Sequence, residues 1–238
     1  RNCSSLHFLF ITAEELPVFE SMGFLIRHSF QFHWKNNFYQ DFDEFLGSLK
    51  RKRRKEIIRE RRQIQQQMIK VEVLEGEAIL VEHINYMYEF YLSTSEKKWG
   101  RPYLSKDFFS RIHQTMCNKL VLFLAYVDGD CVAGTINFKN GKCLYGRYWG
   151  CKGNFRSLHF ELCYYQPIEY AIRKGISLFE AGAQGEHKIQ RGFLPELTYS
   201  AHWLEHPGFR SSISKFLEEE KAAIDQGIEE FTPHSPYR

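Results

Sequence analysis

The chain lacks any close pair of cysteines. Its cysteines include no CxxC pair, and their spacing fits neither a zinc site nor a dense disulfide framework. They are Cys3, Cys117, Cys131, Cys143, Cys151 and Cys163. This pattern predicts reduced thiols, a cytoplasmic location and no bound metal.

Long apolar runs are absent as well. No run approaches the roughly 20 residues that cross a bilayer, and no signal-peptide pattern opens the chain. We therefore expect no membrane span. Low-complexity stretches and short repeats are also lacking, which argues against a repeat architecture. Because the chain begins with Arg1 rather than Met, we expect a fragment of a longer protein, and its oligomeric state stays open.

Net charge is small, at +3 over 238 residues, but it is unevenly distributed. Residues 50–55 read KRKRRK, inside a proline-free stretch over 43–68 that favours a helix starting near Asp41. The cations either form a solvated face or bind an anion such as the phosphates of a nucleic acid. The candidate nucleic-acid-binding residues are Arg51, Arg53, Arg54, Lys55, Arg59 and Arg62.

Apolar residues make up 43% of the chain, which is ample for a packed core. Before the basic stretch, the pattern predicts a strand over residues 5–12, a helix over 13–22 and an alternating strand over 24–34. After it, we expect a strand over 71–74 and helices over 78–99 and 106–118, the second capped by Ser105.

Three apolar segments follow, at 120–127, 131–138 and 142–149. The turn Asn140-Gly141 between the last two is a strong hairpin signal, so an antiparallel meander is expected. A helix is predicted over 158–172, in which Pro167 indicates a kink or a late start near Tyr165. Strands over 176–181 and 197–204 and a helix over 212–230 complete the order.

The segment with the most chemically active groups is 182–195, which reads GAQGEHKIQRGFLP. Its glycines let the backbone approach a ligand, and the strand before it would hold the side chains rigidly. The segment is either a solvated polar turn or a site. As a site it offers Glu186 or His187 as a base, Lys188 and Arg191 for phosphate, Gln184 for orientation and Gly185 for close backbone approach.

The order of elements resembles the fold of the GCN5-related N-acetyltransferases. Within it, residues 158–204 and 37–64 resemble the FemAB-like family of predicted N-acyltransferases of peptidoglycan biosynthesis and recognition. The resemblance implies an α/β fold with a mixed, mostly antiparallel central sheet flanked by helices. It also implies tandem halves: residues 1–40 as the remnant of an incomplete first half, 41–69 as a basic connecting helix and 70–238 as the second half. Whether the missing part completes the active site stays open.

The resemblance implies an N-acyltransferase that passes an acyl or aminoacyl group to an amine, with no tightly bound cofactor. Acetyl-CoA-dependent members bind pyrophosphate with a Q/R-x-x-G-x-G/A loop, whereas residues 151–157 read CKGNFRS. Both acyl-CoA and aminoacyl-tRNA remain possible donors, and the acceptor is a small-molecule or precursor amine. The alternative is a noncatalytic protein that recognises tRNA or a cell-wall precursor through the basic helix and the polar segment.

The same resemblance implies a cleft beside the polar segment. Glu161 joins Glu186 and His187 as a catalytic candidate, because its helix would begin beside the strand ends. Candidates for substrate binding are His159, His202, Arg147 and Trp149. For His159 the alternative is a helix-face role, for the aromatic Trp149 it is a core role, and for His202 it is a side chain that points away from the core.

Overall fold

A computed structural model describes residues 3–97 and 101–238, and the chain divides into two compact units. Unit 1 groups Arg1–His33 with Ala183–Ser235, and unit 2 groups Trp34–Gly182 with Pro236–Arg238. Each unit is therefore built from two segments that are separate in the sequence. The predicted division into residues 1–40, 41–69 and 70–238 follows the resemblance rather than these contacts, and it stays a prediction.

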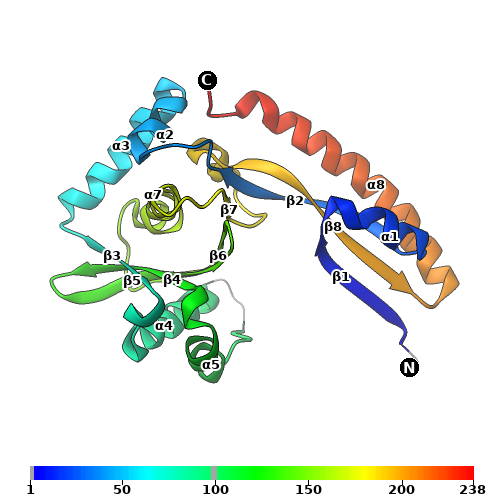
Figure 1. The fold of residues 1–238 in the computed structure, drawn as a ribbon, viewed down its shortest axis with the longest axis horizontal. Coiled ribbons are helices and arrows are strands. Elements are labelled where there is room, and N and C mark those ends of the chain that lie inside the picture. Colours follow the sequence, from blue (N-terminus) through cyan, green and yellow to red (C-terminus); the bar gives the residue numbers. More distant parts are fainter. Residues whose placement is uncertain (1–2, 98–100) are drawn as a thin grey trace. The chain divides into compact units, whose positions relative to one another are not determined.

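Unit 1 contains an antiparallel three-strand arrangement. It consists of β1 (Ser5–Ile11), most of β2 (Leu25–Lys35) and β8 (Leu194–Leu204), with β8 paired to both of the others. A short 3-10 turn η1 (Ala13–Glu15) leads into α1 (Leu16–Ser21), and α8 (Pro207–Phe231) follows β8 (Figure 1). The strands and helices predicted for these parts of the sequence are confirmed.

Aromatic side chains of both helices of unit 1 contact one face of its strands. Phe8 on β1 contacts Phe19 of α1 at 5.0 Å between ring centres, and Phe32 on β2 contacts Phe231 of α8 at 5.9 Å. Phe8 pairs with Ala201 on β8, which is fully buried. Because side chains alternate along a strand, the neighbours of Ala201 point to the opposite face.

Unit 2 contains a five-strand arrangement in the order β7-β6-β5-β4-β3. The strands are β3 (Lys70–Glu75), β4 (Leu120–Val127), β5 (Asp130–Asn140), β6 (Cys143–Cys151) and β7 (Leu178–Glu180). Pairing is antiparallel from β3 to β6 and parallel between β6 and β7. The predicted meander is therefore confirmed, as is the mixed and mostly antiparallel character of the strand pairing.

Helices cover both faces of the unit 2 sheet. On one face α4 (Val81–Lys97) and α5 (Lys106–Met116) bury an apolar cluster that includes Phe90, Phe109 and Leu122 (Figure 1). On the other face, Tyr170 of α7 (Gln166–Arg173) contacts Phe123 of β4 at 5.8 Å. Ser105 caps α5 as predicted, by accepting a hydrogen bond from the Phe108 N–H. The last predicted residue of the α4 helix, Trp99, lies outside the described residues.

The long basic helix predicted over 43–68 is wrong in one respect, because it is two helices. They are α2 (Phe42–Ser48) and α3 (Arg51–Gln66). Leu49 between them has extended backbone and forms a β-bridge with Tyr237, while the Lys50 N–H donates to the Pro236 carbonyl at 2.7 Å. The break depends on a partner at the other end of the chain, which local helix propensity does not contain.

The helix predicted over 158–172 changes its winding in the middle. It runs through α6 (Leu158–Phe160), a π-helical turn η4 (Glu161–Tyr165) and α7. Pro167 stands at the start of α7, where its missing N–H is tolerated, so the predicted late start near Tyr165 is confirmed. Single π turns within helices occur often at functional sites.

Several properties of the described residues bear on function. None of the helices in this part of the chain is long and apolar enough to cross a membrane. Within the same residues, no group of three or more His, Cys, Asp or Glu side chains is placed to hold a metal ion. The six cysteines all lie within the described residues and form no disulfide.

The packing of α4 on β6 generates the first prediction. A Cβ added to Gly150 would lie 2.1 Å from the backbone oxygen of Phe90, so Gly150→Ala must push the helix off the sheet. We expect it to lower the free energy of unfolding by about 3 kcal/mol, measured by chemical denaturation. The control is Gly227→Ala in α8, where nothing lies within 4 Å. That substitution should raise stability by about 0.5 to 1 kcal/mol, and equal effects at both positions would contradict the packing argument.

Candidate active site

The polar segment folds as a 3-10 helix, η5 (Glu186–Arg191), rather than as an open turn. Gly185 before it and Gly192 after it both have φ +96°, a conformation that favours glycine. A side chain at Gly185 would meet the His187 ring at 2.4 Å, so this glycine also makes room for the imidazole. The glycines thus fix where the helix begins and ends.

The two cations of this segment are buried, although their predicted role was to bind phosphate. Lys188 is 5% exposed and its Nζ lies 5.5 Å from the centre of the Phe32 ring. Arg191 is 4% exposed and donates from Nη1 to the His187 carbonyl at 2.8 Å. Gln184 and Glu186 are exposed instead. The phosphate-binding role of the two cations stays a prediction.

The structure perturbs the ionisation of His187. Burial lowers the pKa of its imidazole below the ordinary 6.5, and the positive charges of Arg191 and Lys188 lower it further. The ring is half-buried. His187 is therefore neutral at pH 7, the form in which an imidazole can act as a base.

His202 does not join this segment. It lies on β8, which begins at Leu194 next to the polar segment. At roughly 3.4 Å per residue, about 27 Å of extended strand separates Leu194 from His202. Its partners are His7, with 2.8 Å between the two Nδ1 atoms, and Ser200, whose Oγ lies 2.8 Å from His202 Nε2. The sequence prediction did not include these partners, because only the pairing of β1 with β8 brings His7 opposite His202.

Glu161, the other catalytic candidate, is the first residue of the π turn in unit 2. It is 3% exposed, and its Oε1 accepts hydrogen bonds from Arg61 Nη2 at 3.1 Å and Gln166 Nε2 at 2.8 Å. Its Oε2 is buried and has no hydrogen-bond partner among the described residues. Burial raises the pKa of this carboxyl, and Arg61 partly offsets the rise.

The Glu161 cluster holds α3 against the π turn and α7. Arg61 also bonds to Glu169 at 2.8 Å and lies over the Phe42 ring at 4.6 Å. One residue earlier on α3, the buried Glu60 accepts a hydrogen bond from the Tyr165 hydroxyl. The sequence analysis placed Arg61 in a solvated or anion-binding run, whereas its contacts here are internal.

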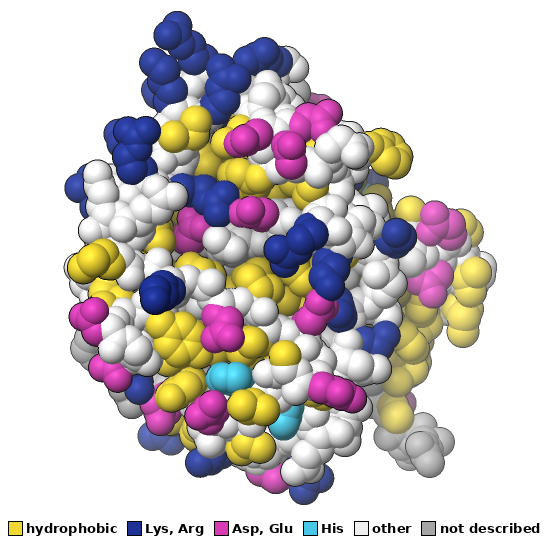
Figure 2. Space-filling view, turned by 60° about the vertical axis from the view of Figure 1, so that its left-hand side comes forward, with side chains coloured by type: hydrophobic (Ala, Val, Ile, Leu, Met, Phe, Trp, Pro, Cys, Tyr) yellow, Lys and Arg dark blue, Asp and Glu magenta, His cyan; other side chains and the backbone are white. Residues whose placement is uncertain are grey.

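The outer face of α3 carries the exposed cations. Arg51, Lys55, Arg59 and Arg62 are exposed and fall on one stripe, about 16 Å long at 1.5 Å per residue. Of the other two candidates, Arg53 pairs with Glu56 at 3.1 Å and Arg54 is partly buried. In Figure 2, dark blue Lys and Arg side chains gather at the upper left, the side on which α3 lies in Figure 1.

The loop over residues 151–157 is held by α3. Gln67 accepts a hydrogen bond from the Arg156 N–H at 3.2 Å and donates to the Arg156 carbonyl at 3.0 Å. The Ser157 hydroxyl donates to Gln63 Oε1 at 2.8 Å. A pyrophosphate at a helix N-terminus needs backbone N–H groups of this kind, and Gln67, the residue that follows α3, already accepts from one of them.

Two of the candidate substrate-binding residues are brought together beside this loop. The His159 ring lies 5.2 Å from Trp149 and 5.6 Å from Tyr164. Arg147 is exposed and occupies a β-bulge, because Asn137 pairs with Gly146 and the next pair skips one residue. Bulges re-aim side chains and are frequent beside active sites. The roles of Arg147, Trp149 and His159 stay predictions.

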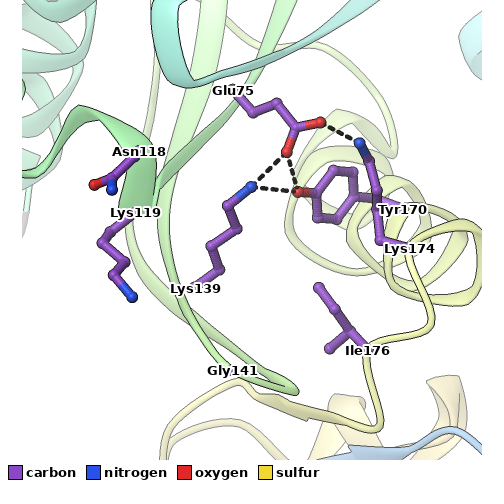
Figure 3. A pocket seen from close by; sticks show the side chains of 8 residues that line it. All are labelled: Glu75, Asn118, Lys119, Lys139, Gly141, Tyr170, Lys174 and Ile176. Carbon is purple, nitrogen blue, oxygen red and sulfur yellow. Dashed lines mark hydrogen bonds and ion pairs between the residues drawn. The ribbon is translucent and has the colours of Figure 1, made fainter.

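A polar cavity of about 310 Å³ lies elsewhere in unit 2, and no sequence-predicted residue lines it (Figure 3). Glu75 at its wall accepts hydrogen bonds from Lys139, Lys174 and Tyr170. Although burial opposes the shift, these bonds lower the pKa of Glu75 to about 2. The carboxylate is therefore ionised at neutral pH and ties β3 to β5 and α7.

A model of the FemAB-like family, described as peptidoglycan biosynthesis/recognition, matches residues 1–238. The chain belongs to the FemAB-like family. This membership confirms the predicted resemblance and supports a transferase. A comparison with curated proteins found no match.

Solved structures share the fold of the chain at low sequence identity. L-PGS from Bacillus licheniformis is 9% identical with a TM-score of 0.64, covering 89% of this chain and 72% of that one. FemX is 12% identical with a TM-score of 0.60, covering 89% and 75%. The C-terminal domain of a putative lysylphosphatidylglycerol synthetase from Agrobacterium fabrum is 11% identical with a TM-score of 0.62, covering 92% and 72%. The predicted fold class is confirmed.

The Glu161 cluster generates the second prediction. Removing Arg61 raises the pKa of the Glu161 carboxyl further, so the folded state binds more protons than the unfolded state. The contribution of Glu161 to stability is then retained below the ordinary pKa of 4.5 and lost as the pH rises. We expect Arg61→Met to lower the free energy of unfolding by about 3 kcal/mol at pH 8, and by less at pH 5.

Chemical denaturation at the two pH values measures this difference. Arg62→Met removes the same charge from the exposed face of α3 and is the matched control. It should change stability by no more than about 0.5 kcal/mol at either pH. A loss for Arg61→Met that is the same at pH 5 and pH 8 would show that Glu161 ionisation plays no part.

Proposed function

We propose that the chain is an aminoacyltransferase that takes its group from aminoacyl-tRNA and passes it to an amine of a peptidoglycan precursor. Membership of the FemAB-like family supports the transferase class and the precursor as acceptor. The choice of donor rests on α3, which presents cations on one face and engages the 151–157 loop with the other.

The outer face of α3 suits a nucleic acid backbone. Four exposed cations at successive turns can each neutralise a phosphate, and this contact needs no base recognition. The inner face argues against acyl-CoA. Gln67 already accepts a hydrogen bond from the Arg156 N–H, and the loop has only one glycine. The loop therefore offers a pyrophosphate few backbone N–H donors.

His187 is the base that we propose for the transfer. The acceptor nitrogen attacks the carbonyl carbon of the aminoacyl ester, its proton goes to His187, and the bond from that carbon to the ribose oxygen breaks. His187 then gives this proton to the leaving ribose oxygen and returns to its neutral form. Buried Arg191 and Lys188 support the step by lowering the pKa of the imidazole, which keeps it neutral before the reaction.

The donor assignment is tested by tRNA binding. A variant in which Arg51, Lys55, Arg59 and Arg62 are all replaced by Gln should bind tRNA more weakly. The slope of log affinity against log salt should fall by about 3, since each phosphate contact contributes about 0.7 to 0.9. Filter binding between 50 and 200 mM salt measures both quantities.

The matched control removes four exposed cations elsewhere, at Lys70, Arg101, Lys106 and Lys215. It should leave the salt slope nearly unchanged. Transfer from labelled acetyl-CoA but not from aminoacyl-tRNA would overturn the choice of donor. Transfer from neither donor by the complete protein would favour the noncatalytic alternative.

The base is tested by His187→Asn against Glu186→Gln. We expect His187→Asn to lower kcat by about 10² to 10⁴ while leaving the KM for the donor unchanged. The exposed neighbour Glu186→Gln should keep most of the activity. In the unchanged protein, kcat/KM should not vary with pH around pH 7, and it should fall only below the ordinary histidine pKa of 6.5. The reverse ranking of the two variants would assign the base to Glu186.

A further inference from the structure

One strand face of unit 1 carries three side chains that are linked by hydrogen bonds. Ser200 and His202 are two residues apart on β8 and therefore point to the same side. His7 is the direct cross-strand partner of His202 on β1. These residues come from strands at the two ends of the sequence.

Two hydrogen bonds link the three side chains in a row. Ser200 Oγ lies 2.8 Å from His202 Nε2, and His202 Nδ1 lies 2.8 Å from His7 Nδ1. If the serine hydroxyl donates to Nε2, the neutral His202 carries its proton on Nδ1 and donates it to His7. A nucleophile, a base and a group that orients the base are then in line, as nucleophilic catalysis requires.

A cation stands beside the serine. Arg27 on β2 is the cross-strand partner of Ser200, so the two side chains share this face. Glu220 of α8 holds Arg27 through Nε at 2.8 Å and Nη2 at 2.6 Å, which leaves Nη1 outside the pair. A positive charge at this position suits an oxyanion that develops on an acyl group attached to Ser200.

Access and protonation agree with this arrangement. His7 is exposed, and Ser200 and His202 are partly exposed. Burial lowers the pKa of His202, and His7 and Arg27 lower it further, whereas Glu220 acts in the opposite direction. His202 is thus neutral at pH 7 and ready to accept the serine proton.

We propose that Ser200, His202 and His7 form a nucleophile site that accepts acyl groups from activated esters. Ser200 Oγ forms the bond to the carbonyl carbon as its proton passes to His202 Nε2. The ester bond then breaks, and the same proton goes to the leaving alcohol. Water or an amine releases the acyl group from the serine by the reverse proton transfers.

This site is separate from the polar segment, at the other end of β8, and the proposal goes beyond the transfer reaction proposed above. Its chemistry is therefore tested without tRNA. The probes are a fluorophosphonate and p-nitrophenyl acetate, applied to the full chain. The readouts are the mass of the adduct, the labelled peptide and the release of nitrophenol.

We expect one fluorophosphonate adduct, located on Ser200 and lost in Ser200→Ala. His202→Asn should slow labelling by about 100-fold, the contribution of a general base. Thr198→Ala is the matched control, since Thr198 shares the strand face but no histidine is bonded to it among the described residues. It should be labelled at the rate of the unchanged protein.

His7 is a positioning residue in this scheme, and its test is the pH profile. Because His7 helps to lower the pKa of His202, His7→Leu should move the acid limb of the labelling rate to higher pH. A variant that only loosened the fold would lower the rate without moving the limb.

Absence of an adduct on Ser200 would overturn the proposal, and so would equal labelling of His202→Asn and the unchanged protein. Thermal unfolding of each variant shows that it is folded. Transfer activity is measured in parallel on Ser200→Ala. If Ser200→Ala loses labelling but keeps transfer, the two sites are independent, and failure of one proposal leaves the other intact.

Discussion

The proposed donor site depends on one constraint, which is the packing of α3 against the π turn η4 and α7. The contacts are polar and mostly internal: Glu60 to Tyr165, Arg61 to Glu161 and Glu169, and the glutamines to the 151–157 loop. Buried charges of this kind are costly unless each is paired. While the inner positions make these contacts, Arg51, Lys55, Arg59 and Arg62 on the outer face of α3 are exposed to solvent. One helix therefore fixes an internal charge cluster, a loop conformation and an exposed basic stripe together.

The polar segment shows that a high density of reactive groups in a sequence does not tell which of them are accessible in the folded protein. Six consecutive residues hold a carboxylate, an imidazole and two cations. Folding sorts them, since the cations turn inward and Glu186 turns outward. The inward cations lower the pKa of the His187 imidazole through their positive charge. One effect of the segment is thus to lower the pKa of the His187 imidazole.

Local patterns in the sequence were sufficient for most elements of the fold. The Asn140-Gly141 turn, the Ser105 cap and Pro167 each act within a few residues, and the hairpin, α5 and the late start of α7 followed from them. The break at Leu49 could not be found this way, because its partner Tyr237 is remote in sequence. The same reason hid the pairing of His7 with His202, whose only sequence signal is alternation along two strands. Burial of Lys188 against Phe32 likewise depends on tertiary packing that overrides the usual exposure of lysine.

The bridge between Leu49 and Tyr237 has a consequence for the order of folding. The Arg238 side chain donates to the Leu49 carbonyl across 189 residues, and its N–H donates to Ser48. A chain is synthesised from its N-terminus, so α2 and α3 emerge long before the residues that satisfy the backbone between them. During that interval residues 49 and 50 are free to continue the helix, which their neighbours favour. Biogenesis would then pass through a continuous basic helix that the last residues of unit 2 afterwards divide.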